Sequence, residues 1–130
     1  MMDTAARILI VDDEPPLLRM MSLYLGRKGY QVSVAMSGAA ARTELAASPG
    51  AFRAVVLDAT MTGTSLPEFG GEILDGNPET SLLVVSGYPV DMSRLEEWAP
   101  ERVAFLHKPF APEMLASALR RLIGSKEESV

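Results

Sequence analysis

The amino-acid sequence predicts an α/β fold, a three-layer (βα)5 sandwich in which a parallel sheet forms the middle layer. Five short runs of aliphatic residues alternate along the chain with longer segments that have helical patterns. The runs are apolar throughout, which is typical of strands that helices cover on both faces. Right-handed crossovers between successive strands then place helices on both sides of one sheet.

The predicted elements have recognisable starts and stops. Pro15 and Pro16 fit the first turn of the first helix, where a missing backbone N–H costs little, and Gly29 follows its end. Ser37 is expected to cap the second helix, and Pro49-Gly50 to close its exit. Strands are expected at residues 7–12, 31–35, 53–58, 81–86 and 103–107, and helices at residues 15–28, 38–47, 66–75, 90–98 and 112–123.

The third helix has the weakest signals. Ser65 and Glu68 form a capping-box pattern, but Gly70 and Gly71 fall within the first turns. Each interior glycine costs about 1 kcal/mol relative to alanine. We therefore expect a short or irregular helix, preceded by a mobile loop at residues 59–65.

The last helix sets the end of the predicted domain. Pro112 is expected to open this helix and Gly124 to end it. The prediction is one domain over residues 1–124, followed by a short, frayed polar tail at residues 125–130.

Composition excludes several classes of function. The chain has 130 residues, a net charge of −5 and no Arg/Lys cluster with interleaved aromatics, which argues against direct binding to nucleic acid or an anionic membrane. Without cysteine it has no disulfide, thiol nucleophile or thiolate metal site. We expect neither a signal peptide nor a spanning helix, since no apolar run approaches the roughly 20 residues that a bilayer requires. These observations predict a soluble, cytoplasmic protein.

Chemically active side chains follow the predicted strands. Asp12 and Asp13 come directly after the first strand, Asp58 ends the third, Ser86 ends the fourth and Lys108 follows the fifth. The carboxyl ends of parallel strands meet at one edge of the sheet, where ligands bind. Three carboxylates gathered there would repel one another. A divalent cation and a phosphoryl group would explain the set.

These residue types suit phosphoryl transfer. Asp13 and Asp58 are candidate ligands for Mg²⁺, and Asp12 would hold a coordinated water or bind the ion directly. Asp58, alone at the end of the central strand, is the candidate nucleophile that would form an acyl phosphate. Lys108 and Ser86 would hold the phosphoryl oxygens. An adjacent Asp pair alone also fits a helix N-terminus. The whole set of side chains, each at a strand end, instead favours a functional site.

The motifs that carry these residues resemble the receiver domains of two-component response regulators. The resemblance covers about residues 7–123 and implies a flavodoxin-like sheet with strand order 2-1-3-4-5. One departure is Thr62, which stands where the family usually has proline. The matching motifs are ILIVDDE at residues 8–14, VLD at 56–58 with Met61 following, VVSG at 84–87 and FLHKPF at 105–110.

This resemblance assigns roles around the metal. It implies that Asp58 accepts a phosphoryl group from a histidine of a sensor histidine kinase or a histidine phosphotransfer protein. It implies Asp13 as the direct Mg²⁺ ligand with Asp12 in support, and the backbone carbonyl of Thr60 as a further ligand. The domain would be regulatory rather than an enzyme, with at most autophosphorylation from small donors and autodephosphorylation.

The resemblance also implies a switch. Phosphorylation would draw Ser86 and Phe105 inward and change the surface formed by the fourth helix, the fifth strand and the fifth helix. The Lys108–Pro109 bond would be cis, which proline makes accessible. The apolar first helix would present either a docking surface for phosphodonor proteins or a wide core face.

Other interpretations remain open at this point. The main alternative is a small Mg²⁺-dependent phosphatase or phosphotransferase with an aspartyl nucleophile. A nucleotide- or flavin-binding module is opposed by the acidic turn at residues 12–16, which has no glycine loop. The residues of the motifs near Ser86 and Phe105 resemble those of receiver domains attached to hybrid sensor kinases. The chain could also be a stand-alone regulator or a relay intermediate, and the sequence leaves open whether it forms a homodimer.

Overall fold

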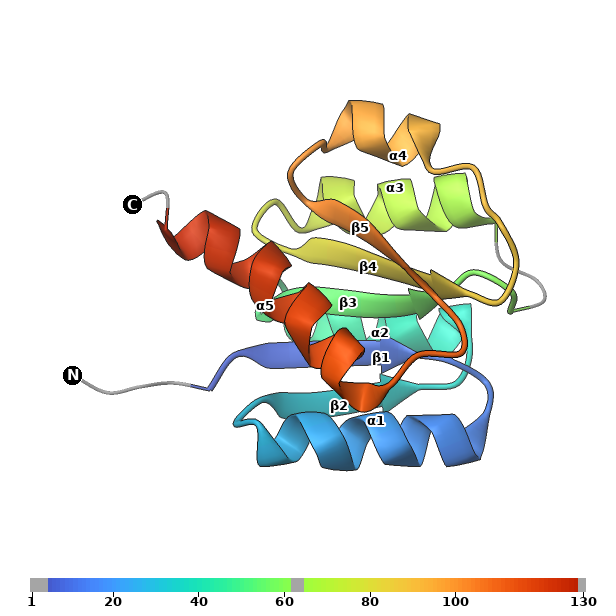
Figure 1. Ribbon diagram of the computed structural model, residues 1–130. Helices are drawn as coiled ribbons and strands as arrows, with labels where there is room; N and C mark the ends of the chain where they lie inside the picture. Colours follow the sequence, from blue (N-terminus) through green and yellow to red (C-terminus); the bar gives the residue numbers. More distant parts are fainter. Residues whose placement is uncertain (1–4, 62–64, 129–130) are drawn as a thin grey trace.

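The computed structural model describes residues 5–61 and 65–128, in which strands and helices alternate throughout (Figure 1). Within these residues the strands form one parallel sheet in the order β2-β1-β3-β4-β5, which confirms the predicted fold class and topology. The elements are β1 (Arg7–Val11), α1 (Pro15–Arg27), β2 (Gln31–Ala35), α2 (Gly38–Ala47), β3 (Phe52–Asp58), α3 (Leu66–Gly76), β4 (Ser81–Ser86), α4 (Ser93–Trp98), β5 (Val103–His107) and α5 (Pro112–Glu128).

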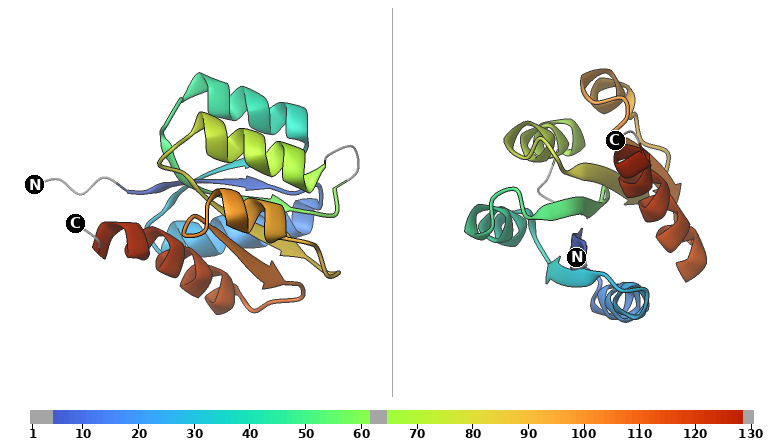
Figure 2. Two further views of the ribbon diagram at one scale, coloured as in Figure 1. Left: turned by 90° about the horizontal axis from the view of Figure 1, so that it is seen from above. Right: turned by 90° about the vertical axis from the view of Figure 1, so that its left-hand side faces the viewer.

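The sheet separates two apolar clusters, because successive strand residues point to opposite faces. In β1, Ile8 and Ile10 pack with residues of α1 and α5, whereas Leu9 and Val11 pack with residues of α2, α3 and α4. Figure 2 shows α2 and α3 on one side of the sheet and α1 and α5 on the other. Burial on both faces explains why the strands read as continuous apolar runs.

Several predicted helix ends are confirmed. Pro15 and Pro16 occupy the first turn of α1, whose C-cap is Lys28, and the next residue, Gly29, has a φ of 100°. That left-handed conformation favours glycine and turns the chain toward β2. The hydroxyl of Ser37 accepts a hydrogen bond from the backbone N–H of Ala40 at 3.0 Å and caps α2.

The expectation of a short or irregular third helix is wrong. The helix α3 runs regularly over 11 residues, and its N-cap residue Ser65 makes no side-chain cap hydrogen bond. Gly70 and Gly71 are buried, so tertiary packing outweighs their low helix propensity. The loop expected at residues 59–65 lies in part outside the described residues, which omit 62–64.

Six other boundaries differ from the prediction, and the ends of α1 and α3 and the start of β3 differ by a single residue. The first strand ends at Val11, one residue early. The helix α4 begins at Ser93 rather than residue 90, because the carboxylate of Asp91 accepts hydrogen bonds from the Ser93 N–H and hydroxyl and holds a turn there. Gly124 does not end α5, which continues to Glu128.

Among the described residues, none of the helices combines the length and apolar character that crossing a membrane requires.

The surroundings of the two glycines of α3 predict that substitution by alanine has opposite effects on stability at the two positions. A Cβ at Gly70 would lie 3.1 Å from methyl carbons of both Leu82 and Leu95, which are themselves buried, whereas a Cβ at Gly71 would meet nothing closer than Trp98 at 4.0 Å. Gly70→Ala should therefore lower the free energy of unfolding by about 1 kcal/mol, because overpacking exceeds the gain in helix propensity. Gly71→Ala should raise it by about 0.5–1 kcal/mol. Urea denaturation of both variants checks this, and equal stabilisation by both would contradict it.

Candidate functional site

Three carboxylates meet at the carboxyl edge of the sheet. Asp12 follows β1 directly and Asp58 is the last residue of β3, and both are buried, whereas Asp13 is exposed. Carboxylate oxygens of these three residues all lie within 4.8 Å of one another. The parallel arrangement of β1 and β3 explains this meeting, since it brings both strand ends to the same edge.

Lys108 reaches into this cluster from the end of β5. Its ammonium lies 3.3 Å from Asp58 Oδ2, 3.4 Å from Asp12 Oδ2 and 3.9 Å from Glu14 Oε1. Burial by itself would lower the pKa of Lys108, but the charges of Asp12 and Asp58 outweigh it and raise that pKa. Lys108 is therefore a stable positive charge in a site with more carboxylates than cations.

Backbone turns hold the two buried carboxylates. Asp58 Oδ1 accepts hydrogen bonds from the Thr60 N–H at 2.9 Å and the Thr60 hydroxyl at 2.7 Å. Asp12 Oδ1 accepts one from the Glu14 N–H at 2.9 Å. Burial raises the pKa of Asp12, against the lowering effect of that N–H, and the negative charge of Asp58 raises it further.

Two predicted site residues have partners other than the carboxylates in this structure. The buried Ser86 hydroxyl donates a hydrogen bond to the backbone carbonyl of Tyr88 at 2.8 Å and accepts one from the Tyr88 N–H at 3.0 Å. Phe105 lies partly buried on β5, and its ring packs edge-on against that of His107 at 6.3 Å between centroids. The Lys108–Pro109 peptide bond is cis.

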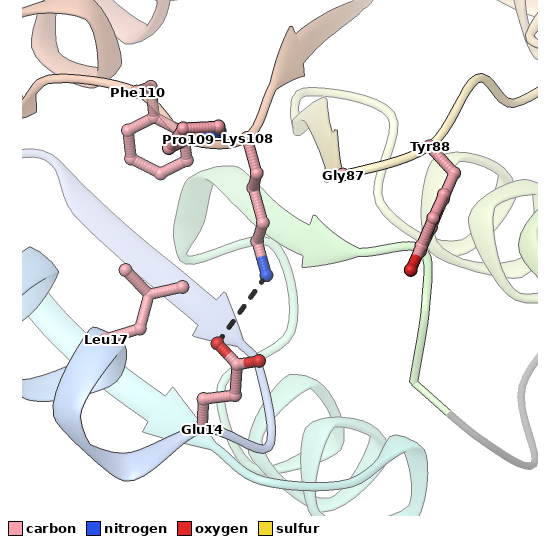
Figure 3. Close-up of a pocket in the computed structure, with 7 residues that line it drawn as sticks. All are labelled: Glu14, Leu17, Gly87, Tyr88, Lys108, Pro109 and Phe110. Carbon is pink, nitrogen blue, oxygen red and sulfur yellow. Dashed lines mark ion pairs between the residues drawn. The ribbon is translucent and has the colours of Figure 1, made fainter.

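Glu14 is a member of the site that the sequence interpretation did not single out. It follows Asp13 in the same strand-to-helix turn, so the acidic run was the available signal. Glu14 and Lys108 line a hollow of about 500 Å³ beside the carboxylates (Figure 3). The other residues that line it are Leu17, Gly87, Tyr88, Pro109 and Phe110.

The donor set fits a hard divalent cation. Asp12, Asp13 and Asp58 offer only carboxylate oxygens, the ligands that such ions prefer. Lys108 compensates only one of their three negative charges. A cation among these oxygens would relieve their mutual repulsion.

Comparison with known proteins gives one consistent match. The family model described as the response regulator receiver domain matches residues 8–120. Sensor kinase CckA of Brucella abortus (strain 2308) is 28% identical over 123 residues, which are 95% of this chain and 13% of that protein. The chain thus spans a small part of the length of this curated relative.

Solved structures agree with the topology. The response regulator TrrA of Thermotoga maritima, in complex with Mg²⁺-BeF, is 28% identical with a TM-score of 0.74, covering 90% of this chain and 98% of its own. The chemotaxis protein CheY4 of Vibrio cholerae is 26% identical with a TM-score of 0.78, covering 92% and 99%. A CheY-like protein of Methanospirillum hungatei JF-1, 20% identical with a TM-score of 0.83 over 98% and 100%, shares the fold.

Proposed function

The chain belongs to the response regulator receiver domain family, and we propose that it is a phosphoacceptor switch of a two-component phosphorelay, with Asp58 as the phosphorylated residue. The observation that carries this proposal is the contact of the buried Asp58 carboxylate with the Lys108 ammonium at 3.3 Å, beside Asp12 and Asp13. The match to the receiver domain family supports a regulatory phosphoacceptor rather than an enzyme with turnover.

Asp58 is the nucleophile in the proposed transfer. A carboxylate oxygen attacks phosphorus as the bond from phosphorus to the donor histidine nitrogen breaks, and the electron pair of that bond stays on nitrogen. The product is an acyl phosphate. The two hydrogen bonds from Thr60 hold the Asp58 carboxylate in one orientation, which lowers the entropy cost of the attack.

Lys108 neutralises charge on the phosphoryl oxygens in this proposal. Its ammonium already faces the Asp58 carboxylate, so a phosphoryl group bound there comes within reach of a short movement of the side chain. Asp13 and Asp58, supported by Asp12 and the backbone carbonyl of Thr60, would hold Mg²⁺, which would neutralise further negative charge when bound.

Ser86 and Phe105 are the proposed switch residues. The Ser86 hydroxyl would exchange its two hydrogen bonds with the Tyr88 backbone for one to a phosphoryl oxygen. Phe105 would then turn inward from β5, and the surface formed by α4, β5 and α5 would change. The proposed phosphodonor is a sensor histidine kinase or a histidine phosphotransfer protein, a class that the match to part of a sensor kinase supports.

Phosphoryl uptake in the presence of Mg²⁺ tests this function. Incubation with acetyl phosphate and Mg²⁺ should add one phosphoryl group per chain. Removal of Mg²⁺ with a chelator should slow uptake by about 100-fold, the equivalent of about 3 kcal/mol of lost charge stabilisation. Intact-protein mass spectrometry measures the uptake, and calorimetric titration measures Mg²⁺ binding separately. Continuous turnover of phosphate esters, or uptake that is equally fast with chelator, would contradict the proposal.

A further inference from the structure

The hollow beside Lys108 is apolar on its walls and charged at its base. In Figure 3, Lys108 extends between Leu17 and Phe110 on one side and Tyr88 on the other, with its ammonium directed at Glu14. The side chain of Lys108 is 16% exposed and that of Glu14 is 59% exposed. The hollow therefore offers space, near the Glu14 carboxylate, for the rest of a small phosphodonor whose phosphoryl group reaches Lys108.

Charge near Lys108 is not balanced. The ammonium is shared by Asp58 and Asp12 at 3.3 and 3.4 Å and lies 3.9 Å from Glu14. Because the two nearer carboxylates already compensate its charge, Glu14 adds net negative potential to the hollow. Because the Glu14 side chain is 59% exposed, water and salt screen part of this potential, and its effect is largest at low ionic strength.

We propose that Glu14 is a specificity-determining residue that discriminates between phosphodonors by the charge of their leaving group, disfavouring anionic leaving groups such as carboxylates. The proposal rests on the proposed function of Asp58 as phosphoacceptor. Glu14 touches neither Asp58 nor the reacting phosphorus in this scheme. It acts through the electrostatic potential of the hollow in which the leaving group separates.

Two small phosphodonors differ in the charge that develops on the leaving group in the hollow. When Asp58 attacks acetyl phosphate, the bond between phosphorus and the acetate oxygen breaks, and the electron pair leaves on acetate as a full negative charge. When Asp58 attacks phosphoimidazole that is protonated on its distal nitrogen, the nitrogen–phosphorus bond breaks and neutral imidazole leaves. The first reaction builds negative charge beside Glu14, and the second removes a positive charge that Glu14 attracted in the bound donor.

The ratio of the two rates isolates this effect. Replacing Glu14 also removes one of the three carboxylates near Lys108. This change affects how Lys108 binds the phosphoryl oxygens, which both donors have, and it therefore cancels in the ratio of the two rates. With Mg²⁺ and low salt, Glu14→Gln should raise the second-order rate constant for acetyl phosphate by about 3–10-fold and leave that for phosphoimidazole unchanged or lower. The ratio of phosphoimidazole to acetyl phosphate rates should thus fall about 3-fold or more, and added salt should shrink the difference.

Glu101→Gln is the matched control, because Glu101 is exposed and lies before β5, at the opposite end of the sheet from Lys108. Mass spectrometry of the full chain measures all rates, with circular dichroism as a check on folding. A ratio in Glu14→Gln equal to that of the wild type and of Glu101→Gln would overturn the proposal while the phosphoacceptor function stands. Absence of uptake from either donor by the wild type would instead overturn the proposed function itself.

Discussion

Replacing Asp58 with asparagine is expected to abolish phosphoryl uptake, lowering its rate by at least about 1000-fold, because an amide oxygen is a far weaker nucleophile than a carboxylate. The amide oxygen of the introduced asparagine can still accept the hydrogen bonds that Thr60 donates to Asp58 Oδ1. Loss of one negative charge beside the buried Asp12 also relieves repulsion. The variant should therefore remain folded and lose only its chemistry.

Mass spectrometry after incubation with acetyl phosphate and Mg²⁺ measures this loss. Asp75→Asn is the matched control, since Asp75 is an exposed aspartate of α3 that lies outside the carboxylate cluster, and it should take up one phosphoryl group at the wild-type rate. If Asp58→Asn acquired the same mass as the wild type, the phosphoryl group would reside elsewhere and the assignment of Asp58 would fail.

The second large effect is on stability and concerns Arg102, next to the amino end of β5. Its guanidinium donates hydrogen bonds to the backbone carbonyls of Thr80, Leu74 and Asn77, at distances from 2.7 to 3.0 Å. These carbonyls belong to the end of α3 and the turn into β4. Arg102→Ala should lower the free energy of unfolding by about 3 kcal/mol, because partly buried carbonyls lose a charged donor.

Thermal denaturation should show this as a fall in Tm of about 10 °C. Arg94→Ala is the matched control, since Arg94 is an exposed residue of α4, and its Tm should change by no more than about 2 °C. A similar Tm for both variants would mean that water replaces the guanidinium at these carbonyls without cost.

The strands and most helices could be predicted from local sequence, because burial on both faces requires continuous apolar runs such as residues 8–11. Helix α3 was predicted at residues 66–75, but its regular course was not, because its two glycines disfavour a helix locally. The packing of Gly70 against Leu82 and Leu95, which lie further along the chain, decides the outcome. The end of α5 was missed for a related reason. Glycine commonly ends a helix by adopting a positive φ, and among the described residues Gly29 and Gly50 do so, whereas Gly124 does not.

The sequence by itself determined which carboxylates and which lysine gather at one edge, because each follows a strand and parallel strands end at the same side of the sheet. Tertiary structure alone decided how these groups pair. It places the Glu14 carboxylate 3.9 Å from the Lys108 ammonium and pairs the Ser86 hydroxyl with the Tyr88 backbone. The position of a residue along the chain determines which strand end carries its side chain. The direction in which that side chain points depends on packing between segments that are distant in sequence.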